Sequence, residues 1–257
     1  MVSIDLNADL GEATAGNAVS DDTAMIELIS SANVACGFHA GEPVGIARTI
    51  AAAAQANVTI GAHPGYRDIP GFGRRFIDYN PAELREELLY QIGAIHTLAR
   101  VNGRGVSYVK PHGALYNAIV HHEAQAEVVV DSVKKFNRTF DLDVPLLLLP
   151  GSIAIDIADA AGVRVVREAF ADRNYNPDGT LVSRRLPNAV LHDPKLVADR
   201  VVELAKTGTL TASDGTQIKV QADSICVHGD SPGAVDMTRS ITEALKAAGI
   251  EKRSFAS

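Results

Sequence analysis

The chain of 257 residues contains no tryptophan and two cysteines, and only 5% of its residues are aromatic. Cys36 and Cys226 lie far apart and form neither a C-x-x-C nor a zinc-finger spacing, which excludes a disulfide scaffold and a thiolate metal site. No apolar run approaches the roughly 20 residues that span a bilayer. The N-terminus lacks the basic segment and apolar stretch of a signal peptide. We therefore expect a cytoplasmic protein that does not enter a membrane.

Positive charge is also scarce, since 24 basic residues face 31 acidic ones and the net charge is −7. The basic residues do not cluster as phosphate-backbone binding requires, so nucleic acid is not an expected partner. The sequence has no P-loop, no G-x-G-x-x-G run after a strand and no G-x-S-x-G elbow. These absences favour a nucleophilic water, activated by a carboxylate or a histidine, over a nucleophilic serine or cysteine.

The chain does contain a regular alternation of short apolar runs with longer amphipathic segments, which is typical of β-α units around a parallel sheet. The clearest helix begins at Asn80-Pro81, an N-cap followed by a first-turn proline, and ends at Asn102-Gly103. No linker marks a boundary, so we expect a single β/α barrel domain over residues 1–257. The candidate strands are Ser3–Ala8, Asn33–Cys36, Val58–Ala62, Val106–Lys110, Pro145–Leu149, Val163–Glu168 and Ser224–His228.

One segment, Thr209–Val220, departs from this alternation. Asp214-Gly215 suits a two-residue turn, and the segment predicts a β-hairpin outside the barrel.

Polar residues of catalytic type follow five of the seven candidate strands. Because the loops after parallel strands share one face of a barrel, these side chains are expected to meet around one mouth. Four of the eight histidines are among them, whereas His96, His121, His122 and His192 fall in helices or loops. The polar residues are Asn7, Asp9, Glu12, His39, His63, Lys110, His112, His228 and Asp230.

Lys110 is the most informative of these residues. A period of two places Tyr108, Lys110 and His112 on one strand face, so the ammonium points into the mouth if Val109 packs outward. A buried ammonium needs a carboxylate or an anionic substrate beside it. The pattern therefore predicts a catalytic lysine, with a structural ion pair as the alternative.

The remaining mouth residues allow both functional and structural interpretations. Asp9 and Glu12 suit a general base or metal ligands, or they hold neighbouring loops by hydrogen bonds. Asp9, His39 and His63 are the candidate ligands of a divalent metal, but the H-E-x-x-H spacing is absent and a tightly bound metal is not expected. Asp230 suits both catalysis and capping of a helix beginning near Pro232.

Loop arginines could grip a carboxylate or phosphate in bidentate fashion, although solvated surface charge is the alternative for each. Arg74 and Arg75 lie in the long loop Pro64–Tyr79, and Arg184 lies in the loop Arg173–Asn188.

The segments that carry these residues resemble the LamB/YcsF family along nearly the whole chain. The resemblance implies an irregular seven-stranded parallel β/α barrel, similar to the glycoside hydrolase/deacetylase fold. The chain departs from the family's pattern at Ala13–Asn17, so the loop after Glu12 is not predicted. The matching segments are Asp5–Glu12, Asn33–Gly41, Gly61–Gly65, Gly71–Arg75, Val109–Asn117, Phe170–Arg173, Pro177–Arg184 and Cys226–Asp230.

The resemblance also implies an activity, hydrolysis of the lactam of 5-oxoproline to L-glutamate with cleavage of ATP to ADP and phosphate, performed with two other subunits. Lys110 would then stabilise a phosphate or a carboxylate, while Asp9, Glu12 or a mouth histidine would orient water and return a proton to nitrogen. The implied substrate-binding residues are Asn7, Arg74, Arg75, Tyr116, Arg173 and Arg184.

Two features of this reaction stay open at the level of sequence. Because no nucleotide motif is present, ATP with Mg²⁺ is expected either in a loop of this chain or on a partner subunit. The rival functions are a metal-dependent, deacetylase-like amidohydrolase and a non-catalytic lactam-binding or regulatory subunit.

Overall fold

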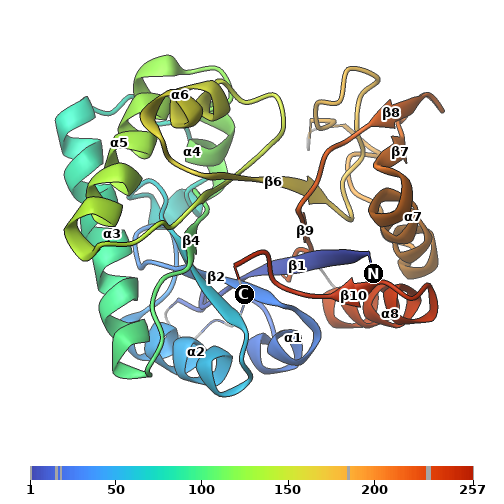
Figure 1. Ribbon diagram of the computed structural model, residues 1–257, viewed down its shortest axis with the longest axis horizontal. Helices are drawn as coiled ribbons and strands as arrows, with labels where there is room; N and C mark the ends of the chain where they lie inside the picture. The colour runs from blue at the N-terminus through green and yellow to red at the C-terminus, as the bar shows by residue number, and fades with distance from the viewer. Residues whose placement is uncertain (1, 15–16, 18, 184–185, 230–232, 257) are drawn as a thin grey trace.

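The computed structural model describes residues 2–14, 17, 19–183, 186–229 and 233–256 (Figure 1). Seven parallel strands pair in a closed ring, in the order β1, β2, β3, β4, β5, β6, β9, and β9 pairs again with β1. Each of the seven expected runs overlaps one of these strands, so the predicted seven-stranded barrel is confirmed. The strands are β1 (Ser3–Leu10), β2 (Ser31–Ala35), β3 (Thr59–His63), β4 (Tyr108–Val109), β5 (Leu146–Leu148), β6 (Val165–Phe170) and β9 (Ser224–Cys226).

Helices surround this ring (Figure 1). The predicted start of α3 is confirmed, since the Asn80 side chain accepts a hydrogen bond from the backbone N–H of Ala82 and Pro81 opens the helix. Among the helices of the described residues, none combines the length and the apolar character that crossing a bilayer requires. The helices are α1 (Asp22–Leu28), α2 (Pro43–Gln55), α3 (Pro81–Val101), α4 (Gly113–Ala118), α5 (Glu123–Phe140), α6 (Ile153–Ala161), α7 (Pro194–Thr207) and α8 (Ala234–Ala247).

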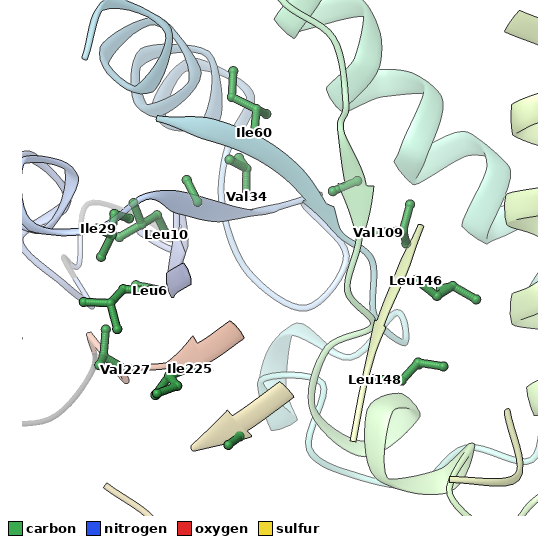
Figure 2. Packing of buried hydrophobic residues seen from close by; sticks show 14 of the residues in the cluster. Leu6, Leu10, Ile29, Val34, Ile60, Val109, Leu146, Leu148, Ile225 and Val227 are labelled. Carbon is green, nitrogen blue, oxygen red and sulfur yellow. The ribbon is translucent and has the colours of Figure 1, made fainter. Parts of the chain in front are cut away.

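The apolar core lies between the strands and the helices. Figure 2 shows labelled strand residues of this core, among them Leu6, Val109 and Leu148. Because side chains alternate along a strand, the residues adjacent to these outward-facing ones point into the barrel. Val109 thus packs outward, as expected, and Tyr108 and Lys110 are buried inside.

The barrel interior combines buried polar side chains, among them Asp5, Asn7 and Asn33, with a small apolar cluster of Tyr108, Leu147 and Val166. Branched apolar layers fill most such barrels. Tyr108 crosses the interior and donates a hydrogen bond to Oδ1 of Asn33 at 2.6 Å. Only glycine at position 61 allows this crossing, because a Cβ there would lie 2.2 Å from Cζ of Tyr108. The aromatic ring of Tyr108 divides the barrel interior into two levels. The lower level contains Asp5 and Ser31, and the upper level, at the mouth, contains Asp9 and Lys110.

Two short elements lie outside the seven-stranded ring. The predicted hairpin is confirmed as β7 (Thr209–Thr211) and β8 (Gln217–Lys219), but its predicted two-residue turn is wrong. Ala212 donates to the carbonyl of Thr216 at 2.8 Å, which leaves a three-residue loop that ends at Gly215 with a φ of 90°. At the other edge, β10 (Glu251–Lys252) pairs with the start of β1.

The chain after β10 closes the lower end of the barrel. The ring of Phe255 lies 5.1 Å from the ring of Tyr108, and the hydroxyls of Ser254 and Ser31 are 3.1 Å apart. The interior is therefore accessible from the end where the strands point their carboxyl termini, and this end holds the predicted mouth residues.

Candidate functional site

A cavity of about 450 Å³ opens at the carboxyl ends of the strands. Its wall combines residues at or after the carboxyl ends of β1, β3, β4, β6 and β9, so segments far apart in the sequence converge as expected for a parallel barrel. Of the residues selected from the sequence, those that line it are Asp9, His63, Arg74, Lys110, His112, Tyr116, Arg173 and His228.

Lys110 is the centre of the charged network on the cavity floor. Its Nζ lies 2.8 Å from Oε1 of Glu168, 3.3 Å from Oδ1 of Asp9 and 3.2 Å from Oδ1 of Asn7. A fourth contact is Sγ of Cys226 at 3.2 Å. Burial alone would lower the pKa of Lys110, but the attraction of the carboxylates outweighs it and raises that pKa well above its usual value. The lysine is therefore a permanent buried cation.

Asp9 presents one carboxylate oxygen to the network. Its Oδ1 accepts a hydrogen bond from Nδ2 of Asn33 at 2.7 Å and lies 3.4 Å from Nε2 of His63, in addition to its contact with Lys110. Burial would raise the pKa of Asp9, but His63 and Lys110 hold it well below its usual value. Among the described residues, none donates a hydrogen bond to Oδ2. An ionised oxygen is thus available at the cavity wall.

Glu168 was not selected from the sequence, although it lies on the inward face of β6. It is fully buried, and its second oxygen accepts a hydrogen bond from the hydroxyl of Tyr116 at 2.8 Å. Burial, with Glu168 next in importance, raises the pKa of Tyr116 well above 10.0, so this hydroxyl stays protonated. Glu168 is therefore the principal counter-ion of Lys110, and the alternation Val166, Glu168, Phe170 was the signal that could have identified it.

His228 and Asp172 form a second acid–base group at the cavity. Nδ1 of His228 lies 2.8 Å from Oδ1 and 2.9 Å from Oδ2 of Asp172. A carboxylate accepts a proton from Nδ1 and so makes Nε2 the basic nitrogen of the ring, as in hydrolytic triads. The ring of Phe170 stacks on His228 with centroids 5.7 Å apart. Asp172 lay within a matching family segment but carried no predicted role.

Four residues from the first four strand ends form an imidazole cluster: Glu12, His39, His63 and His112. One ligand atom from each lies within 4.8 Å of every other. Burial lowers the pKa of His39 well below 6.5 and that of His112 to about 3, with the other histidines adding to both effects. Of the three metal candidates predicted from the sequence, His39 and His63 belong to this cluster, whereas Asp9 lies beside it and Glu12 and His112 complete it.

The remaining selected residues lie in three kinds of place. Asn7 is buried beneath the cavity, where Nδ2 donates to Oγ of Ser224 at 2.7 Å. Arg75 pairs with Asp68, and its side chain is 66% exposed, away from the cavity wall. Arg184 and Asp230 lie outside the described residues.

The two arginines of the cavity wall differ in how they are held. Arg173 donates through Nη2 to the carbonyl of Val182 at 2.6 Å and through Nε to that of Ala189 at 3.2 Å, so it fixes the long loop after β6. The Arg74 guanidinium lies 4.9 Å from the centre of the Phe72 ring. Both guanidiniums line the cavity, where an anion could meet them.

A larger cavity of about 890 Å³ lies outside the barrel, among α1, α2 and the start of α8. Its most buried carboxylate, Asp22, is already bonded to the backbone N–H of Gly11 at 2.8 Å and to Oγ1 of Thr49 at 2.7 Å. These contacts anchor the loop after β1, and the cavity does not contain the charged network.

Comparison with known proteins agrees with this architecture. The model of the LamB/YcsF family matches residues 4–257. A 5-oxoprolinase subunit of Corynebacterium jeikeium is 61% identical over 254 residues, which cover 99% of this chain and 97% of that protein. The crystal structure of a lactam utilization protein from Thermus thermophilus is 40% identical, with a TM-score of 0.92 over 98% of this chain and 100% of that one.

A more distant structure shares the fold alone. The family GH18 chitinase of Chromobacterium violaceum is 13% identical, with a TM-score of 0.53 over 95% of this chain and 83% of that one. The barrel architecture is therefore common to proteins whose sequences have diverged widely.

Proposed function

The chain belongs to the LamB/YcsF family, and from this premise we propose that it is the lactam-opening subunit of an ATP-dependent 5-oxoprolinase. The names of the similar proteins support the proposal, since one is a subunit of a 5-oxoprolinase and another is a lactam utilization protein. The substrate, 5-oxoproline, presents a ring N–H donor, a carbonyl oxygen and a carboxylate. A site for it must recognise all three groups and protonate the departing nitrogen.

The observation that carries the proposal is that a buried ammonium and a histidine–carboxylate pair face one cavity. Lys110 has three protons for four contacts, and one of these is the thiol of Cys226, a weak acceptor. A substrate oxygen that displaces the thiol gains a charge-assisted hydrogen bond in a site of low dielectric constant. Lys110 is thus suited to stabilise the negative charge that develops on the lactam oxygen.

Asp9 and Arg74 complete the recognition of the substrate in this proposal. Oδ2 of the ionised Asp9 can accept the lactam N–H, which orients the ring with its carbonyl toward Lys110. The Arg74 guanidinium can pair with the substrate carboxylate at the mouth. A fixed pair of such contacts lowers the entropic cost of reaching the reactive geometry.

His228 supplies the acid–base chemistry. With its proton held on Nδ1 by Asp172, Nε2 can accept a proton from the attacking water and then deliver it to the ring nitrogen as the C–N bond breaks. ATP would supply the phosphoryl group to the amide oxygen, so that attack by one water with C–N cleavage gives an acyl phosphate, and a second water then releases phosphate from it. In the balanced reaction, 5-oxoproline, ATP and two waters give glutamate, ADP and phosphate.

The proposal assigns ATP to the assembly and leaves the nucleotide site to this chain or to one of its partners. It is tested by measuring glutamate release from 5-oxoproline with this protein alone and with its partner subunits, each with and without ATP. We expect release only when the subunits are combined with ATP.

The variants His228→Gln and Asp172→Asn sharpen this experiment. Both should reduce the kcat of the assembled enzyme by about 10²–10⁴-fold, the usual contribution of a positioned base. Turnover that is unaffected by these changes would favour a non-catalytic lactam-binding role for this chain. Amide hydrolysis by this chain alone without ATP would favour a deacetylase-like amidohydrolase.

A further inference from the structure

The imidazole cluster contains a pair of histidines whose hydrogen bonds conflict unless a cation is present. Nδ1 of His63 lies 2.7 Å from the carbonyl oxygen of Lys110, and Nε2 of His112 lies 2.9 Å from that of Phe72. A carbonyl oxygen can only accept, so both of these nitrogens carry protons. In neutral rings the other two nitrogens, Nε2 of His63 and Nδ1 of His112, carry lone pairs, and Nε2 of His63 also lies 3.4 Å from Oδ1 of the ionised Asp9.

These two lone-pair nitrogens face each other at 3.0 Å. Neither neutral ring can donate to the other, and both rings are buried, with 1% and 3% of their surfaces exposed. Facing lone pairs repel in a site of low dielectric constant. A positive charge shared by the two nitrogens removes this conflict.

The rest of the cluster places two further donor atoms beside the pair. Oε1 of Glu12 lies 3.7 Å from Nδ1 of His112 and 3.1 Å from Nε2 of His39. A tetrahedral zinc site with metal–ligand bonds of 2.0–2.1 Å has its ligand atoms about 3.3 Å apart. These three separations, 3.0–3.7 Å, lie on both sides of this value, and all the ligand atoms of the group lie within 4.8 Å of one another.

The surroundings of the cluster keep the rings close together. The rings of His39 and His112 stack with centroids 3.6 Å apart and an interplanar angle of 5°, so the His39 ring must tilt out of this stack for its lone pair to meet that of His112 at one ion. A Cβ at Gly73 would lie 2.7 Å from Cβ of His39 and 2.8 Å from Cδ2 of His112, so only glycine fits there. The carbonyls that bond His63 and His112 are the outer partners that metal-bound histidines usually have.

We propose that Glu12, His39, His63 and His112 bind one divalent transition-metal ion of the zinc class. Three imidazoles and one carboxylate suit such an ion better than Mg²⁺ or Ca²⁺, which prefer oxygen ligands. His63 and His112 also line the 450 Å³ cavity, so the ion lies at the wall beside Asp9 and Lys110. Asp9 and Glu12 offset the positive charge of Arg74, which lines the same small recess.

The experiment measures metal binding without any turnover, so its result is independent of the proposed lactam chemistry. The full chain is produced with zinc in the medium, its metal content is measured by mass spectrometry, and the stripped protein is titrated with Co²⁺. We expect about one equivalent of metal and the visible absorption band of four-coordinate Co²⁺, which Zn²⁺ then displaces. Metal-free protein without a Co²⁺ band would overturn the proposal and leave a shared proton between His63 and His112.

Two variants assign the site to these residues. His112→Gln keeps an N–H for the carbonyl of Phe72 but removes the lone pair at Nδ1, and Glu12→Gln keeps the shape of the side chain. Each should weaken Co²⁺ binding by at least about 100-fold, the upper range for loss of a mere supporting contact. The matched control His192→Gln changes an exposed histidine and should bind as the wild type does. Equal binding by all variants would contradict the assignment, and the wild-type titration decides the matter if a variant fails to fold.

Discussion

Asp5 and Asp9 lie on the inward face of the same strand, four residues apart, and their pKa values shift in opposite directions. Burial raises the pKa of Asp5 to about 6, even though three serine hydroxyls, Ser30, Ser31 and Ser224, donate to its carboxylate. Burial acts on Asp9 too, but His63 and Lys110 hold its pKa well below 3.8. The comparison shows that neighbouring charge, and not depth in the barrel, decides which carboxylate is ionised.

The largest expected effect follows from removing Lys110, the buried cation at the upper level of the barrel interior. Lys110→Met leaves Glu168 buried without its counter-ion and removes one of the two groups that lower the pKa of Asp9, so Asp9 becomes more like Asp5. The free energy of unfolding should fall by about 3–5 kcal/mol. Glutamate formation by the assembled enzyme should fall by about 10³-fold or more.

A double variant tests whether the Lys110–Glu168 pair causes this loss. Urea unfolding followed by far-UV circular dichroism suits this chain, which lacks tryptophan. Lys110→Met combined with Glu168→Gln should recover part of the lost stability without recovering activity. Full turnover in Lys110→Met would remove the lysine from the mechanism.

Asp5→Asn tests the protonation of the carboxyl group at the lower level of the barrel interior. The folded pKa of Asp5 lies above its unfolded value of 3.8, so the folded state binds this proton more tightly. Its stabilising contribution is present below about pH 4 and is lost as the pH rises through about 6. Relative to Asp5→Asn, the wild type should lose about 2 kcal/mol of unfolding free energy between pH 4 and pH 7.

Unfolding curves at several pH values in this window measure the difference. A stability difference between wild type and Asp5→Asn that does not vary between pH 4 and pH 7 would show that the carboxylate is already ionised when buried.

Gly61→Ala tests the aromatic ring of Tyr108, which separates the upper and lower levels of the barrel interior. The added Cβ overlaps the ring of Tyr108, which must shift and lengthen its bond to Asn33. Overpacking of this kind costs about 1–3 kcal/mol of stability. Thermal unfolding measures the loss, and Gly45→Ala is the matched control, since a Cβ at Gly45 meets no atom within 4 Å. Equal losses in both variants would mean that helix or backbone effects, not Tyr108, determine the cost.

The smallest effect is expected at Arg75, whose exposed guanidinium pairs with Asp68 outside the cavity wall. Solvent screens this charge from the network around Lys110. In Arg75→Ala, the KM for 5-oxoproline should therefore stay within about twofold of the wild-type value. A tenfold rise in KM would place Arg75 in contact with the substrate.

The sequence by itself determined the barrel and the end of it that carries the chemistry. Strand runs and helix signals depend on local periodicity, and parallel strands bring their carboxyl ends to one face whatever the details of packing. For the same reason Lys110 could be placed inside the barrel, since period two follows directly from Val109 packing outward.

Only the tertiary structure decided how these polar groups are partnered. Glu168 and Asp172 were missed because a lone acidic residue in a strand or loop does not reveal which cation lies across the barrel. The substrate-binding roles of Arg173 and Arg75 stay predictions, but the bonds of Arg173 to two carbonyls and the pairing of Arg75 with Asp68 are contacts that no sequence spacing encodes. The protonation of Asp5 and Asp9 and the facing nitrogens of His63 and His112 likewise depend on distances of about 3 Å between separate strands, where electrostatic energies change most steeply.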